Sequence, residues 1–265
     1  MLIALALGMS AAVGARVGGQ GATAEVLQAR HYFFADAKAD SPYTLFVSTK
    51  YRPGVAAPLI VALHGNGANP DEIMYVRGLT QFAGDRGYIV VAPMGFNPYA
   101  GYGSRGPGRA ANRPDDPENA GALSEIDVLN VINLVEHDFT IDNHRVYLLG
   151  HSMGGAGALY LGTKYPERWA GMALFAPGTR GTDTAAAGIA ALKTIPMIVF
   201  QGKDDTQVLA GNTRRFVAAL KRSSVALEYH EMVGDHMSII GWTPQNIARA
   251  FDFLEAHTKQ QAVRQ

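Results

Sequence analysis

Short hydrophobic runs recur along the chain, and most of them are apolar throughout. Residues 59–63 (LIVAL) and 88–92 (YIVVA) are examples, and each run ends in turn residues. Strands that are buried on both faces have this pattern, which is typical of a parallel sheet covered by helices. Strands are predicted at residues 43–48, 59–63, 88–92, 145–149, 171–175, 197–200 and 227–231.

Segments with helical periodicity lie between these runs. In residues 123–139, apolar side chains repeat at the three- and four-residue spacing of a helix face. Helices are also predicted at residues 70–86, 155–164, 212–221 and 244–258. Because strands and helices alternate from about residue 32 onward, the sequence predicts one doubly wound α/β domain over residues 29–265.

The composition excludes several classes of protein. Of the 265 residues, 48% are hydrophobic and 17% are charged, which is incompatible with a disordered chain. The 23 basic and 23 acidic residues balance, so no nucleic-acid partner is expected. The chain has no cysteine, which excludes disulfides, thiolate metal sites and a cysteine nucleophile.

The first fifteen residues (MLIALALGMSAAVGA) form an apolar run that ends in small residues. This pattern is typical of a secretory signal peptide, although no basic residue precedes the run. We therefore expect residues 1–28 to be a signal peptide or another N-terminal extension; the alternative is an apolar helix packed on the domain. The expected location is extracellular or periplasmic, and otherwise cytoplasmic. The run is too short and too rich in glycine for a stable membrane span.

One long segment, residues 97–121, has no hydrophobic period and is rich in Gly, Pro, Arg and Asn. It follows the predicted strand 88–92, and ligands of parallel α/β sheets bind beyond the carboxyl ends of the strands. Tyr99 and Tyr102 are therefore candidate walls of a substrate cleft. The alternative is a solvated loop with two ordinary surface tyrosines.

The strongest chemical signal is the G-x-S-x-G pattern of Gly150, Ser152 and Gly154. It lies between a predicted strand and a predicted helix, which is the context that a nucleophile elbow requires. A serine on such a sharp turn needs neighbours with almost no side chain, and the helix N-terminus favours negative charge that develops there. Ser152 is therefore the predicted nucleophile.

A serine needs a general base, which follows the nucleophile along the chain in this type of site. His230 is predicted to lie within a strand and His257 at the polar end of the last helix. His236 lies in a turn between a strand and the last helix, from which its imidazole can reach the ends of the strands. We predict His236 as the base.

The predicted site also needs an acid that pairs with the base and two backbone groups that bind the oxyanion. Asp204 and Asp205 are the two candidate acids, since they directly follow the predicted strand 197–200. The backbone N–H of Met153, the residue after the nucleophile, is the first predicted oxyanion donor. The second is the N–H of Asn66, or alternatively of Gly67, in the loop after the strand 59–63.

The segments LHGNG, GHSMGG, QGKDD and GDH together resemble the α/β-hydrolase superfamily. Within it, the chain resembles the secreted esterases grouped with polyhydroxybutyrate depolymerases and feruloyl esterases, from residue 43 to residue 257. Further support comes from residues 93–98, 123–128 and 141–147. The acid pattern of that group, His-Gly-x-x-Asp-x-x-Val, corresponds to Gln201, Gly202, Asp205 and Val208, so the resemblance favours Asp205 over Asp204. Gln201 stands where the group usually has histidine.

The resemblance implies an α/β-hydrolase fold and a carboxylic ester hydrolase that works through Ser152, His236, Asp205 and an acyl-enzyme. We expect a small-molecule or polymeric ester as substrate, Trp242 near the pocket, and neither cofactor nor metal. The first alternative is a serine peptidase of the prolyl-oligopeptidase type, which usually carries a large extra domain for which this chain has no room. The second is a non-catalytic binding protein with the same fold.

Overall fold

The structure is a computed structural model that describes residues 27–104, 115–179 and 186–259. The predicted signal peptide or extension falls outside these residues, apart from its last two, which begin the first strand. Within the described part of the chain, no helix has the length and apolar character that a membrane span requires.

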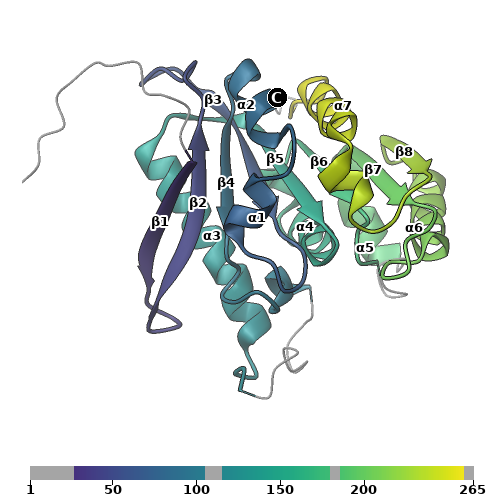
Figure 1. Cartoon of the computed structure of the whole chain (residues 1–265), viewed down its shortest axis with the longest axis horizontal. Coiled ribbons are helices and arrows are strands. Elements are labelled where there is room, and N and C mark those ends of the chain that lie inside the picture. The colour runs from purple at the N-terminus through teal and green to yellow at the C-terminus, as the bar shows by residue number, and fades with distance from the viewer. Residues whose placement is uncertain (1–26, 105–114, 180–185, 260–265) are drawn as a thin grey trace, which may run out of the picture.

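In the described part of the chain, eight strands form one sheet with the order β1-β2-β4-β3-β5-β6-β7-β8 (Figure 1). Pairing is parallel from β4 to β8 across the sheet, whereas β1 and β2 run antiparallel at one edge. The strands are β1 (Leu27–Phe34), β2 (Ala39–Val47), β3 (Ala57–Leu63), β4 (Ile89–Pro93), β5 (Ile141–His151), β6 (Gly171–Phe175), β7 (Met197–Gly202) and β8 (Leu227–Met232). The mainly parallel sheet predicted from the hydrophobic runs is confirmed.

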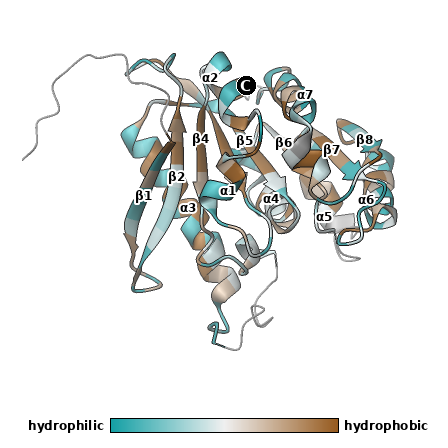
Figure 2. Ribbon diagram, in the orientation of Figure 1, coloured by the Kyte–Doolittle hydropathy of each residue, from teal (hydrophilic) through white to brown (hydrophobic). Residues whose placement is uncertain are grey.

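Helices cover both faces of the sheet because successive side chains of each buried strand point to opposite faces. In β3, Leu59, Val61 and Leu63 belong to the apolar cluster that also contains residues of α3, α4 and α6, whereas Ile60 and Ala62 belong to the cluster that contains residues of α1, α2 and α7. The helices are α1 (Pro70–Met74), α2 (Leu79–Arg86), α3 (Ala120–Asp138), α4 (Met153–Lys164), α5 (Ala186–Ala191), α6 (Ala210–Arg222) and α7 (Pro244–Glu255). Figure 2 shows the hydrophobic central strands between the two helical layers.

Two predictions about the elements were wrong in detail. The helix predicted at residues 70–86 is two helices, α1 and α2, separated at Gly78, which has a left-handed φ of 91° that favours glycine. The edge strand β1 was not predicted, because Gln28, Arg30 and His31 interrupt its apolar residues and only the last of its side chains, Phe34, is buried.

A buried carboxylate ties the loop after β4 to the rest of the domain. Asp127 of α3 accepts hydrogen bonds from the hydroxyls of Tyr32 and Ser41, at 2.7 and 2.6 Å, and from the N–H of Gly95 at 2.7 Å. Burial raises the pKa of Asp127, and these hydrogen bonds oppose that effect. The loop that approaches the carboxyl end of β3 is thereby held against α3.

Candidate active site

Ser152 lies on a strained turn between β5 and α4, with φ of 56° and ψ of −115°. A side chain on Gly150 would overlap the backbone of Gly154, and one on Gly154 would overlap the carbonyl of Leu63. Both glycines are therefore required for the helix to start this close to the sheet. Such strain is often found at functional residues, where the surrounding structure holds the backbone in place.

The backbone of Ser152 is fixed on both sides. Its N–H donates to the carbonyl of Phe175 at 2.9 Å, and its own carbonyl accepts from the N–H groups of Ala156 and Gly178 at 3.1 and 2.9 Å. The hydroxyl makes no hydrogen bond to another described residue. The side chain is partly exposed and lines two adjoining cavities, so a substrate can reach its oxygen.

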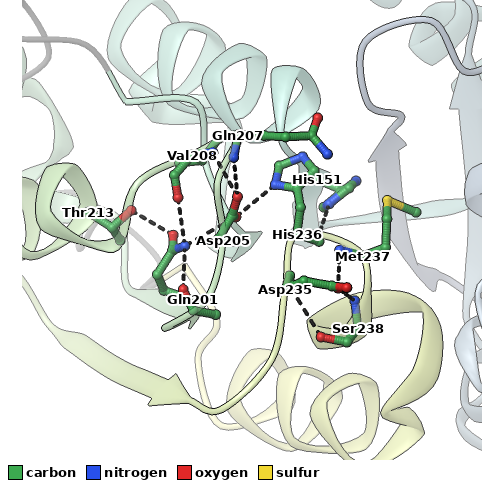
Figure 3. Close-up of polar contacts among 11 residues, drawn as sticks. His151, Gln201, Asp205, Gln207, Val208, Thr213, Asp235, His236, Met237 and Ser238 are labelled. Atoms are coloured by element: carbon green, nitrogen blue, oxygen red, sulfur yellow. Dashed lines mark hydrogen bonds and ion pairs between the residues drawn. The ribbon is translucent and has the colours of Figure 1, made fainter.

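His236 and Asp205 form a buried pair beside this turn (Figure 3). The Nδ1–H of His236 donates to Oδ2 of Asp205 at 2.7 Å, and the residues are 5% and 3% exposed. The other carboxylate oxygen accepts from the backbone N–H groups of Gln207 and Val208, both at 2.8 Å. Because Nδ1 donates to the carboxylate, Nε2 of the neutral ring is left as the proton acceptor. His236 and Ser152 line the same cavity.

Gln201, which stands where the resembling esterases have histidine, supports this carboxylate. Its Nε2 donates to Oδ2 of Asp205 at 3.2 Å and to the carbonyls of Gly202 and Val208 at 3.1 and 3.0 Å. The hydroxyl of Thr213 donates to Oε1 of Gln201 at 2.7 Å, which fixes the orientation of the amide (Figure 3). With glutamine instead of histidine at position 201, Asp205 therefore still receives a hydrogen bond from a side chain of β7.

Asp204, the other candidate acid, anchors the loop that carries His236. Its carboxylate accepts from the N–H of Gly234 at 3.1 Å, and its own N–H donates to the carbonyl of Gly234 at 3.0 Å. Gly202 has no room for a side chain against that same carbonyl. Of the two candidate acids, Asp205 therefore contacts the imidazole of His236, whereas Asp204 contacts the backbone of the loop that carries His236.

His151, within the elbow itself, also holds the loop of His236. Its Nε2–H donates to the backbone carbonyl of His236 at 3.0 Å, and the two rings lie 4.7 Å apart between centroids. Burial lowers the pKa of His151 to about 4, and a positive charge on His236 would act in the same direction. His151 was not predicted as a site residue from the sequence. Its position between Gly150 and Ser152, next to the predicted nucleophile, is the signal that could have indicated it.

We predict that His151 makes the folded protein sensitive to acid. In the unfolded chain this imidazole binds a proton below about pH 6.5, whereas in the folded protein its pKa is about 4. The unfolded state therefore binds more protons between these values, and stability falls as the pH falls. This one group accounts for a loss of about 3 kcal/mol across that window.

Urea unfolding at pH 6.5 and pH 4 would measure the effect in the wild type and in His151→Gln, which keeps a donor for the His236 carbonyl. We expect the wild type to lose about 3 kcal/mol more than the variant on acidification. An equal loss in both proteins would show that His151 is protonated in the folded state.

Three further histidines lie apart from the pair of His236 and Asp205. His230 of β8 contacts the carboxylate of Glu228 at 3.2 Å, and Nδ1 of His257 donates to the carbonyl of Phe253 at 2.7 Å. His64 is buried next to the carbonyls of Gly65 and Met94, and burial lowers its pKa. These contacts are typical of a structural histidine that supports the backbone of neighbouring loops.

The three aromatic residues predicted to lie near the substrate have different surroundings in the structure. Tyr102 is fully buried, its hydroxyl accepts from the N–H of His64 at 3.1 Å, and it lines neither cavity, so a direct contact with substrate is not supported. Tyr99 is half-buried, with its ring against Gly67 of the loop after β3. Trp242 ends the π-helical turn Ser238–Trp242, and its side chain lies outside the described residues.

Two adjoining cavities of about 550 and 320 Å³ meet at Ser152. Asn66, Ser152 and Gln207 line both. Met153, the first residue of α4, lines only the larger one, whereas His151, His236 and Met237 line only the smaller one. Among the described residues, no group of three or more His, Cys, Asp or Glu side chains is arranged to hold a metal ion.

Comparison with known proteins identifies a family and a fold for the chain. The sequence model of the family described as "putative esterase" matches residues 37–245. S-formylglutathione hydrolase of Rattus norvegicus is 28% identical over 130 residues, which are 45% of this chain and 46% of that protein. The chain thus aligns with about half the length of the curated relatives it matches.

Solved structures show the same fold. A thermostable esterase superposes with a TM-score of 0.68 at 23% identity, over 88% of this chain and 63% of that one. A ferulic acid esterase from Anaeromyces mucronatus, in complex with ferulic acid, superposes with a TM-score of 0.67 at 18% identity, over 91% of this chain and 94% of that one. These likenesses show an α/β-hydrolase fold, and since the family match spans most of the sequence, the chain belongs to the putative esterase family.

Proposed function

We propose that the protein hydrolyses carboxylic esters, with Ser152 as nucleophile, His236 as general base and Asp205 as the acid that orients it. The observation that supports this most is the buried hydrogen bond of 2.7 Å between His236 and Asp205, in a cavity that Ser152 also lines. A paired imidazole beside a strained, accessible serine is the arrangement that activates a hydroxyl for acyl transfer.

In the first half of the reaction, Nε2 of His236 takes the proton of the Ser152 hydroxyl as its oxygen attacks the ester carbonyl. The carbonyl oxygen becomes an oxyanion, which the backbone N–H groups of Met153 and Asn66 stabilise. The tetrahedral intermediate then collapses as His236 gives its proton to the leaving alkoxide. The products of this half are a free alcohol and an acyl ester on Ser152.

In the second half, His236 takes a proton from a water molecule that attacks the acyl-enzyme. The second tetrahedral intermediate releases the carboxylic acid, and the same proton returns to the oxygen of Ser152. Asp205 stays ionised throughout and stabilises the imidazolium that forms in each half. His236 thus acts as a base and then as an acid in both halves.

The size of the larger cavity favours acyl groups larger than formyl. The curated relatives are named for S-formylglutathione, whose acyl group has a single carbon. A space of about 550 Å³ beside Ser152 is within the range of ordinary small-molecule sites. We therefore favour esters of longer or aromatic acids over formyl thioesters.

A comparison of three substrates at matched concentration tests the proposal. We expect a p-nitrophenyl ester of a medium-length acid to be cleaved with a higher kcat/KM than either S-formylglutathione or a prolyl peptide anilide. A fluorophosphonate probe should label Ser152, as located by peptide mass spectrometry. Preferred cleavage of the anilide would instead support a peptidase, and failure of the probe to label Ser152 would support a non-catalytic binding protein.

A further inference from the structure

The second half of the proposed reaction, on which this inference rests, needs a water molecule in a defined place. The leaving alcohol faces His236, because His236 protonates it, and the attacking water takes the same place once the alcohol has left. Ser152 and His236 both line the smaller cavity. The water that attacks the acyl-enzyme therefore binds in the smaller cavity.

This water has two hydrogens, and the base removes only one of them. One O–H bond breaks as its proton moves to Nε2 of His236. The water oxygen then forms a bond to the acyl carbon, whose carbonyl electrons move to the oxyanion. The second hydrogen stays on the attacking oxygen. An acceptor for this hydrogen orients the lone pair of the water towards the acyl carbon, and such orientation accelerates attack.

Gln207 lies where such an acceptor is needed. Its backbone N–H donates to Oδ1 of Asp205 at 2.8 Å, which fixes the residue relative to the pair of Asp205 and His236. Figure 3 shows its side chain extending past the ring of His236, with the amide group on the side of the ring away from Asp205. Nε2 is on that side of the ring, since Nδ1 donates to Asp205. The amide therefore lies on the side of His236 at which the water has to bind.

The side chain of Gln207 can be reached from both cavities. It is exposed, and Gln207, Asn66 and Ser152 are the described residues that line the two cavities together. The amide makes no hydrogen bond to another described residue. Its oxygen is an acceptor and its nitrogen a donor, and neither carries a charge. Gln207 can therefore bind a water molecule in the smaller cavity without changing the charge of the site.

We infer that Gln207 positions the water that hydrolyses the acyl-enzyme, by accepting its second hydrogen at Oε1. This contact is made only when the nucleophile is water. An alcohol that attacks the same acyl-enzyme gives its one hydroxyl hydrogen to His236 and carries carbon in place of the second hydrogen. It has nothing to donate to the amide, so loss of the amide slows hydrolysis and not alcoholysis.

The partition of the acyl-enzyme between water and methanol measures this difference. Each variant is mixed with a p-nitrophenyl ester at a fixed methanol concentration, and the initial amounts of carboxylic acid and methyl ester are quantified by mass spectrometry. Their ratio depends only on the fate of the acyl-enzyme, so differences in folded enzyme or in acylation rate cancel. Damage to His236 or Asp205 slows both nucleophiles, which share one base, and leaves the ratio unchanged.

We expect the ratio of acid to methyl ester to fall about tenfold in Gln207→Met, which keeps the length of the side chain but has no amide. Gln207→Glu, which keeps an acceptor at the same position, should retain the wild-type ratio. Thr206→Val is the matched control, because Thr206 is an exposed residue of the same loop that lines neither cavity. Its ratio should equal that of the wild type.

Equal ratios in the wild type and Gln207→Met would overturn this inference. An equal fall in Gln207→Met and Gln207→Glu would also overturn it, because the acceptor would then make no difference. If Ser152→Ala forms neither product above the rate without enzyme, the proposed esterase function stands whatever the ratios are. If Ser152→Ala still forms these products, the proposed function fails instead, so the two failures are distinguishable.

Discussion

Replacement of Ser152 by alanine is expected to lower kcat for ester hydrolysis by about 10⁴–10⁶. Without the hydroxyl no acyl-enzyme can form, and only the oxyanion donors and substrate positioning remain to assist water. His236→Ala should cause a loss of the same order, because the serine then has no base. Since the two residues act as one unit, the double variant should be scarcely slower than either single variant.

Steady-state hydrolysis of a p-nitrophenyl ester measures these losses, and mass spectrometry after rapid quenching detects the acyl group on Ser152. His230→Ala is the matched control, because His230 is also a histidine after the nucleophile but pairs with Glu228 on β8. Its activity should stay close to that of the wild type. Near wild-type hydrolysis by Ser152→Ala would falsify the proposed mechanism.

The second large effect is expected from the two adjacent aspartates. Asp205→Asn should lower kcat by about 10⁴, because an asparagine amide at this position no longer holds the imidazole in its reactive tautomer or stabilises the imidazolium. Asp204→Asn should cost far less, since among the described residues this carboxylate accepts only the N–H of Gly234, and an amide oxygen can also accept it.

Measurement of kcat/KM across the pH range for Asp205→Asn and Asp204→Asn would distinguish the role of Asp205 from that of Asp204. We expect Asp205→Asn to change the pH profile, because it alters the group paired with His236, and Asp204→Asn to keep the wild-type profile. The reverse order of activities would assign the acid to Asp204. Far-UV circular dichroism on both proteins checks that the loop substitutions leave the fold intact.

Much of the fold follows from hydrophobic patterning, because the strands of the parallel core are buried on both faces. Residues 171–175 illustrate this: all five are buried in β6, and the predicted strand has the observed bounds. Gly150 and Gly154 identified the nucleophile elbow because steric overlap excludes other residues there. These signals are local, and the sequence carries them directly.

Other features depend on contacts between distant segments and could not be predicted from local pattern. Tyr102 lies in a polar, glycine-rich segment, yet its ring is buried because Gly157 of α4 leaves room for it. The contact of His151 with the carbonyl of His236 spans 85 residues of sequence.

The loops that carry His236 and Asp205 both lie at the β8 edge of the sheet. Asp205 follows β7 and His236 follows β8, and among the described strands β8 is terminal and pairs with β7 alone. Edge strands and their loops open at lower free energy than the centre of a sheet. Heating should therefore separate the imidazole from the serine while β3, β5 and β6 remain paired, so that thermal inactivation begins below the midpoint of global melting and reverses on cooling.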